Sequence, residues 1–87
     1  MSVLEWEERA YDELADIYVV ATPDEREVIV AEVERIERDL KGDPLDVGEG
    51  RVDTIRVEIR GPLVFWFEVL LDGQLVRILR VTRPTRE

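Results

Sequence analysis

The chain of 87 residues contains no cysteine and no histidine, and lysine occurs only once, at Lys41. Without cysteine there is no disulfide bond and no thiol chemistry, and the composition is consistent with a reducing compartment. Without histidine there is no imidazole to act as acid or base near neutral pH, to complete a catalytic triad or to bind zinc in the usual way. Any catalysis would depend on carboxylates, arginines, two tyrosines and that lysine.

The sequence also lacks a long apolar run. The longest, residues 63–71 (LVFWFEVLL), is interrupted by Glu68, whereas a helix that spans a membrane needs about 20 apolar residues. The first residues, MSVLEWEER, show no basic segment followed by an apolar one, as a secretory signal would. We therefore expect a cytoplasmic protein with no membrane partner, folded as one domain over residues 1–87.

Acidic side chains are in excess and give a formal net charge of −9. Residues 1–50 carry five basic and sixteen acidic side chains, a net −11, whereas residues 51–87 carry seven arginines and five acidic side chains, a net +2. The first part would repel nucleic acid. The second part relies on arginine, which binds carboxylates and phosphates through two parallel hydrogen bonds. An ordinary surface of mixed charge is the alternative interpretation.

A strand and two helices are predicted in the first half of the chain. Residues 3–6 (VLEW) favour a short strand, and the apolar spacing that follows predicts a helix over about 7–21. The sequence TPDE at 22–25 combines an N-cap threonine, a proline at the first helical position and a glutamate that completes a capping box. The second helix should therefore start there and run to about Leu40, with Gly42 ending it.

The second half of the chain predicts a sheet. Residues 43–50 are rich in glycine, proline and aspartate and are expected to form a loop. Three strands follow over 51–60, 63–71 and 75–83, separated by Gly-Pro and Asp-Gly turns. The predicted fold class is α+β: a short N-terminal strand, a two-helix hairpin and a three-stranded antiparallel meander, with the helices packed on one face of the sheet.

The face of the sheet turned away from the helices carries the candidate site. Apolar and charged residues alternate along the first meander strand, which predicts Arg56 and Arg60 on this outer face. The second strand is apolar on both faces and places Trp66 and Glu68 there as well. A tryptophan on an open face indicates that something covers it, either a partner protein or the chain's own loop 43–50 or C-terminal tail.

The last strand carries Arg77, Arg80 and Arg83 at a spacing of three. In a regular strand Arg80 cannot share a face with the other two arginines. We expect the larger apolar set of this strand to face the helices; it consists of Leu75, Leu79 and Val81. Arg80 would then lie on the outer face, near Trp66. The opposite phase, which exposes Arg77 and Arg83, and a β-bulge are the alternatives.

The order of elements and three segments resemble the RelE/ParE superfamily of bacterial type II toxins. The segments are VLEWEERAYDELADI, ERIERDLKGDPLDVGEGR and RVEIRGPLVFWFEVLLDGQLVRILRVTR, which together span nearly the whole chain. The resemblance implies a toxin that is neutralised by a cognate antitoxin protein and acts on translation, by cutting mRNA on the ribosome, or on DNA gyrase. We expect no cofactor and no metal.

The resemblance implies catalytic positions at Arg56, ahead of the central strand, and at Arg80 and Arg83 in the last strand. The predicted partner-binding residues are Arg60, Trp66 and Glu68. A structural alternative pairs these arginines with carboxylates of the sheet. If the protein is an enzyme, it is a ribosome-dependent endoribonuclease, but the acidic charge, the missing histidine and the lack of a tyrosine in the last strand argue against cleavage. A non-catalytic protein-binding module or homodimer on the same fold is the alternative function.

Overall fold

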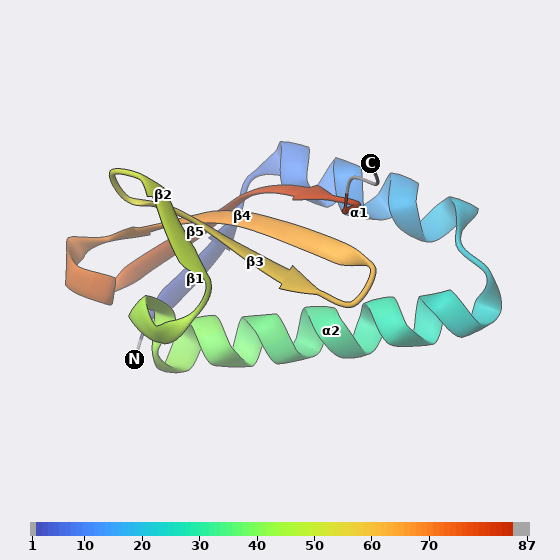
Figure 1. Ribbon diagram of the computed structural model, residues 1–87, viewed down its shortest axis with the longest axis horizontal. Coiled ribbons are helices and arrows are strands. Elements are labelled where there is room, and N and C mark those ends of the chain that lie inside the picture. The colour runs from blue at the N-terminus through green and yellow to red at the C-terminus, as the bar shows by residue number, and fades with distance from the viewer. Residues whose placement is uncertain (1, 85–87) are drawn as a thin grey trace.

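A five-stranded sheet forms the centre of the fold, and two helices cover one of its faces (Figure 1). The computed structural model describes residues 2–84. In chain order the elements are β1 (Val3–Trp6), α1 (Glu8–Val20), α2 (Pro23–Gly42), the 3₁₀ turn η1 (Pro44–Asp46), β2 (Glu49–Val52), β3 (Ile55–Arg60), β4 (Leu63–Leu70), the 3₁₀ turn η2 (Leu71–Gly73) and β5 (Leu75–Thr82). The strand order is β1-β5-β4-β3-β2, with β1 parallel to β5 and the other pairs antiparallel. The predicted α+β class is confirmed.

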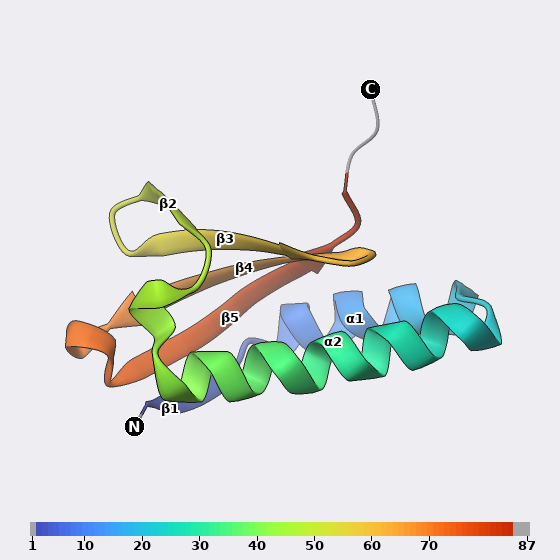
Figure 2. The ribbon, with the colours of Figure 1, turned by 60° about the horizontal axis from the view of Figure 1, so that its bottom comes forward.

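The helices form where the local signals place them, except that Gly42, which was expected to end α2 after about Leu40, is the last residue of the helix and Asp43 is its C-cap. The hydroxyl of Thr22 accepts a hydrogen bond from the Glu25 N–H (3.2 Å), and the Glu25 carboxylate accepts one from the Thr22 N–H (2.9 Å). This is the predicted capping box, and its hydrogen bonds lower the pKa of Glu25. Both helices lie on the same side of the sheet (Figure 2). Within residues 2–84, no helix is long and apolar enough to cross a membrane.

The hydrophobic core lies between the helices and the helix-side face of β4 and β5. Its largest fully buried side chains come from α2, β4 and β5; they are Ile29, Ile36, Leu40, Leu63, Phe65, Phe67, Val76, Ile78 and Val81. On α1, Ala10 is completely buried, and this small side chain lets the helix approach β5 closely. Leu14 and Ile17 of the same helix pack against the core, as their spacing predicted.

The meander has four strands rather than the three that were predicted. The segment 51–60 is not one strand, because the chain turns back after Val52 and begins β3 at Ile55. Asp53 occupies the turn with φ = 50°, a left-handed conformation that aspartate tolerates better than most residues. The predicted loop 43–50 is also partly wrong, since η1 and the first two residues of β2 fall inside it.

The prediction that Arg56 and Arg60 lie on the outer face is wrong. In the observed register Arg56 is opposite Phe67 and Arg60 is opposite Leu63, so both share the helix-side face. The apolar residues of β3 are on the other face, where Val57 lies opposite Trp66. The inversion is possible because charged side chains of this strand meet η1 and the acidic surface of α2, rather than the apolar core.

A β-bulge in β5 changes the predicted phase of the last strand. Trp66 is opposite Arg80 while the next residue of β4, Phe67, is opposite Ile78, so Leu79 is the extra residue. Ile78, before the bulge, and Val81, after it, both face the helices. Of the three residues expected to face the helices, Leu75, Leu79 and Val81, only Val81 does so. Arg77 and Arg80 therefore share the outer face, against the expectation for a regular strand. The bulge was the alternative considered from the sequence.

Replacing Ile36 by valine should lower the free energy of unfolding by about 1 kcal/mol, because the change removes part of a fully buried side chain. Val20, which is 75% exposed, supplies the control: Val20→Ala should change the free energy of unfolding by less than about 0.5 kcal/mol. Urea unfolding of both variants measures the difference. Equal losses in the two would contradict this placement of the core.

Candidate functional site

The sheet face turned away from the helices, called the open face from here on, contains a hollow. The hollow has a volume of about 410 Å³ and is lined by Glu7, Arg9, Ile55, Trp66, Leu79 and Arg80. Three strands and the start of α1 therefore contribute to it. The view in Figure 2 shows the helices on one side of the sheet and no second layer of helices on the other. The hollow joins an apolar floor to charged walls.

Trp66 forms the floor of this hollow at the centre of β4. Its side chain is partly exposed, and the indole Nε1–H donates a long hydrogen bond of 3.4 Å to the hydroxyl of Thr82. Two small neighbours on the same face, Val57 and Val64, are buried around it. Because the ring is held by neighbours on both adjacent strands, it offers a fixed apolar platform.

Arg80 is held in place by Glu13 of α1. Its Nη2 and Nε lie 2.7 Å and 3.1 Å from Glu13 Oε2, and Glu13 Oε1 accepts the Val81 N–H at 3.1 Å. The pairing with Glu13 raises the pKa of Arg80. For Glu13, burial on its own raises the pKa, but the hydrogen bonds from Arg80 and Val81 outweigh it, so the pKa lies below its ordinary value. The Glu13 carboxylate thus binds both the guanidinium of Arg80 and a backbone N–H at the edge of β5.

Arg77 is the second arginine of the open face, and three carboxylates surround it. Its Nη1 lies 3.1 Å from Glu68 Oε1, its Nη2 lies 3.3 Å from Glu5 Oε1, and its Nε lies 3.8 Å from Glu7 Oε1. The hydrogen bond with Glu5 is the main cause of its raised pKa. The predicted partner-binding residue Glu68 therefore lies on the same face as Trp66, and its charge is balanced by Arg77.

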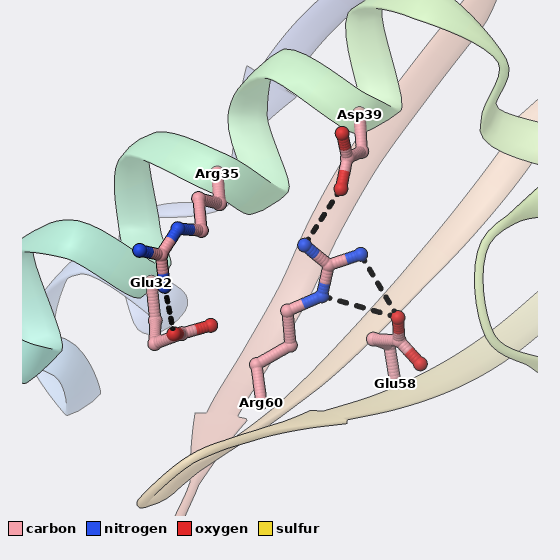
Figure 3. Close-up of polar contacts among 5 residues, drawn as sticks. All are labelled: Glu32, Arg35, Asp39, Glu58 and Arg60. Atoms are coloured by element: carbon pink, nitrogen blue, oxygen red, sulfur yellow. Dashed lines mark hydrogen bonds and ion pairs between the residues drawn. The ribbon is translucent and has the colours of Figure 1, made fainter.

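Arg60 lies on the helix-side face of the sheet, whereas Trp66 lies on the open face. The side chain of Arg60 points toward Asp39 of α2 and Glu58 (Figure 3). Its Nη1 is 2.7 Å from Asp39 Oδ2 of α2, and its Nε and Nη2 are 3.1 Å and 3.0 Å from Glu58 Oε2. The side chain is only 17% exposed. Burial lowers the pKa of Arg60, but the bonds to both carboxylates outweigh this and raise it. The residue joins β3 to α2 and is not part of the open face.

Arg56 binds backbone carbonyls rather than carboxylates. Its Nε donates to the Val47 carbonyl (2.9 Å), and its Nη2 donates to those of Gly48 (2.9 Å) and Leu45 (3.2 Å). The segment around η1 is therefore fastened on the helix side, where Val47 enters the core. The alternative that loop 43–50 covers the open face is therefore not what the structure shows. Of the tail, residues 85–87 lie outside the described part of the chain.

The three arginines predicted as catalytic do not meet in one place. Arg80 lines the hollow, Arg56 holds the η1 segment on the opposite face, and Arg83 lies with its Nη1 4.0 Å from Glu25 Oε2 of α2. The prediction missed Glu7, Arg9 and Glu13, which line the hollow or anchor it. No local pattern in the sequence marks these residues, because their role depends on α1 running beside β5.

Comparison with known proteins identifies the fold. No protein-family model and no curated protein matches the sequence at a significant level. Solved structures do match: a chain of the chromosomal ParDE TA system from P. aeruginosa superimposes with a TM-score of 0.73 and 25% identity, covering 98% of both chains. The chain has a RelE/ParE-like toxin fold.

Two further structures agree with this assignment of the fold. A chain of the RelBE2 toxin–antitoxin complex from Mycobacterium tuberculosis matches 98% of this chain and 93% of its own, with a TM-score of 0.74 and 22% identity. The isolated E. coli RelE toxin matches 100% of this chain and 88% of its own, with a TM-score of 0.67 and 16% identity. The RelE/ParE resemblance read from the sequence is confirmed as a likeness of fold.

Replacing Glu13 by glutamine should lower the urea midpoint at pH 7, because Arg80 loses the charge that holds it. The folded-state pKa of Glu13 is depressed, so its ionised form stabilises the protein above the ordinary value of 4.5, and this contribution is lost as the pH falls through the folded-state pKa. The difference between wild type and E13Q should therefore shrink at acidic pH.

The matched control for this prediction is Glu34→Gln. Within residues 2–84 Glu34 makes no ion pair. At each of the two pH values, the urea midpoint of E34Q should therefore be nearly the same as that of the wild type. Urea unfolding at neutral pH and near pH 3 measures both variants. A deficit in E13Q that stays the same size at both pH values would rule out the charge of Glu13 as the cause.

Proposed function

We propose that this chain is the toxin component of a type II toxin–antitoxin system and is held inactive by a cognate antitoxin protein. The main support is the fold match along 98% of the chain to a chain of the ParDE TA system, together with the match to the RelBE2 toxin–antitoxin complex. The hollow of the open face, with Trp66 as floor and Arg80 on its wall, is the candidate surface through which the toxin acts.

The charges around the hollow favour a protein target over RNA. Arg80 and Arg77 are already paired with Glu13 and Glu68, which leaves Arg9, 3.9 Å from Glu13, as the exposed arginine that could offer charge to phosphates. Cutting RNA would also require an acid and a base beside the scissile phosphate. Glu7 is the carboxylate that lines the hollow, and its Oε1 is 3.8 Å from the Nε of Arg77. Of the two targets that the sequence resemblance implies, we therefore favour DNA gyrase over the ribosome.

Induced expression in a bacterial host should arrest growth, and co-expression of the antitoxin should restore it. Trp66→Ala and Arg80→Ala should each relieve the arrest, because they remove the floor and the charged wall of the hollow. Arg35→Ala is the matched control: this exposed arginine pairs with Glu32 on α2 and should leave the arrest intact. Circular dichroism of the purified variants checks that each one folds.

The same cultures separate the two targets. Loss of plasmid supercoiling before any fall in methionine incorporation is the expected result, since it points to gyrase. A fall in methionine incorporation with mRNA cut at codon intervals would assign the ribosome instead. If the folded wild-type protein accumulates and growth continues, the chain is not an active toxin, and a non-catalytic binding module on this fold becomes the better explanation.

A further inference from the structure

The open face carries apolar side chains well beyond the hollow. Ile59 lies opposite Val64, and Val52 lies opposite Ile55, so both residues extend the apolar surface around Trp66. Ile59 is 64% exposed and Val52 is 63% exposed. Beside β3, strand β4 is apolar at seven of its eight positions, which is typical of a strand that is covered on both faces. The helices cover only one face of the sheet (Figure 2), so the other face has apolar surface to offer to a partner.

The negative charge of the molecule lies mainly on the opposite side. The helices α1 and α2 together carry eleven acidic and five basic side chains, a net −6. On the open face Arg77 is paired with Glu68, and Arg80 is paired with Glu13, so these charges cancel. Two open faces packed against each other would place both acidic helical layers on the outside, separated by the two sheets. A second copy therefore meets less like charge on the open face than on the helices.

The open face also contains both a protrusion and a hollow. Ile55 of β3 and Trp66 line the hollow, and Ile59, the most exposed apolar residue of β3, follows four residues after Ile55. Four residues of a strand span about 13 Å. In a twofold dimer each copy presents the same patch, so the protrusion and the hollow that receives it must lie on one face of the chain. The open face meets this requirement through a single strand.

We propose that two copies of this chain associate through their open faces, with Ile59 of each copy entering the hollow of the other. There it would contact the second copy's apolar lining of Ile55, Trp66 and Leu79. The two sheets would pack face to face at about 10 Å, as the sheets of a β-sandwich do. Each hollow is then completed by a residue of the other copy. If the proposed function holds, this dimer hides the surface through which the toxin acts, and the monomer is the active form.

The area of the open face is enough for a dimer of moderate affinity. The sheet has five strands, of which β3, β4 and β5 are six to eight residues long, so its projected area is roughly 450 Å². Two such faces would bury roughly 900 Å², and more where side chains interdigitate, which is the lower end of the range for specific interfaces. We therefore expect association at micromolar concentrations.

The charges disfavour other occupants of the open face. Nucleic acid and anionic membranes are repelled by a chain with a net charge of −9. A highly charged protein segment would find Arg77 and Arg80 already paired. An apolar surface of low net charge and matching shape is the suitable occupant, and a second open face is such a surface.

Sedimentation equilibrium of the purified chain tests the proposal. The average mass should rise from 10.2 kDa toward twice that value as the concentration increases from about 1 to about 200 µM. Because the acidic helical layers still repel each other at long range, added sodium chloride should strengthen the dimer by screening them. A chain that stays monomeric at the highest concentration in both low and high salt would overturn the proposal.

Two matched lysine variants locate the interface. Ile59→Lys would bury an unpaired charge in the second copy's hollow and should weaken the dimer at least about tenfold. Val20→Lys adds the same charge at a residue of α1 that is 75% exposed, and it should leave the dimer as strong as in the wild type. Circular dichroism checks that both variants fold. Equal dimer strength in I59K and V20K would overturn the open face as the interface.

NMR spectra of the wild type at increasing concentration provide a second measurement that needs no variant. Shift changes should centre on Ile55, Ile59 and the indole N–H of Trp66, and signals of α2 such as Val30 should stay constant. Changes that centre on the helices would contradict the proposal. Both measurements are independent of growth arrest, because a chain that is no toxin can still form this dimer and a toxin can fail to form it.

Discussion

The β-bulge at Leu79 is the constraint on which both surfaces of the sheet depend. A regular strand would turn either Ile78 or Val81 away from the helices, whereas the extra residue lets both enter the core. The same shift turns Arg77 and Arg80 together to the open face. The core and the arginine-lined hollow are therefore two consequences of one local irregularity. Glu13 stabilises the strand just beyond the bulge, since it binds both Arg80 and the N–H of Val81.

Local signals in the sequence predict the bounds of the helices and of the last two strands well. For the helices the reason is that the interactions that form them are local. The capping box at Thr22 and Glu25 is an example, since both partners lie within one turn. The failures concern Asp53, whose turn divides one predicted strand into two, and Leu79, whose extra position shifts the phase of β5. Neither residue has a distinctive neighbour, and their conformations are determined by pairing between strands: β2 with β3 at Asp53, and β4 with β5 at Leu79.

The candidate site was predicted only in part, and alternation was the reason. Assigning Arg56 and Arg60 to the open face assumed that the apolar side of β3 faces the core. In the structure that apolar side surrounds Trp66, while the arginines fasten η1 and α2 from the helix side. The alternation of apolar and charged residues shows which residues share a face of the strand, but not which face turns toward the helices. Only Trp66, Glu68 and Arg80 were placed on the right side of the sheet.

Charge is used in opposite ways on the two sides of the molecule. The arginines of the sheet form ion pairs with carboxylates of the same chain, so the open face is close to neutral despite its guanidinium groups. The excess negative charge remains on the helices, where Asp12 and Asp16 make no ion pairs among the described residues. One element, α1, belongs to both sides: Tyr11 and Tyr18 lie on its apolar side next to α2, while Glu13 reaches Arg80 at the hollow. Glu13 therefore connects α1, on the helix side of the sheet, to Arg80 on the open face.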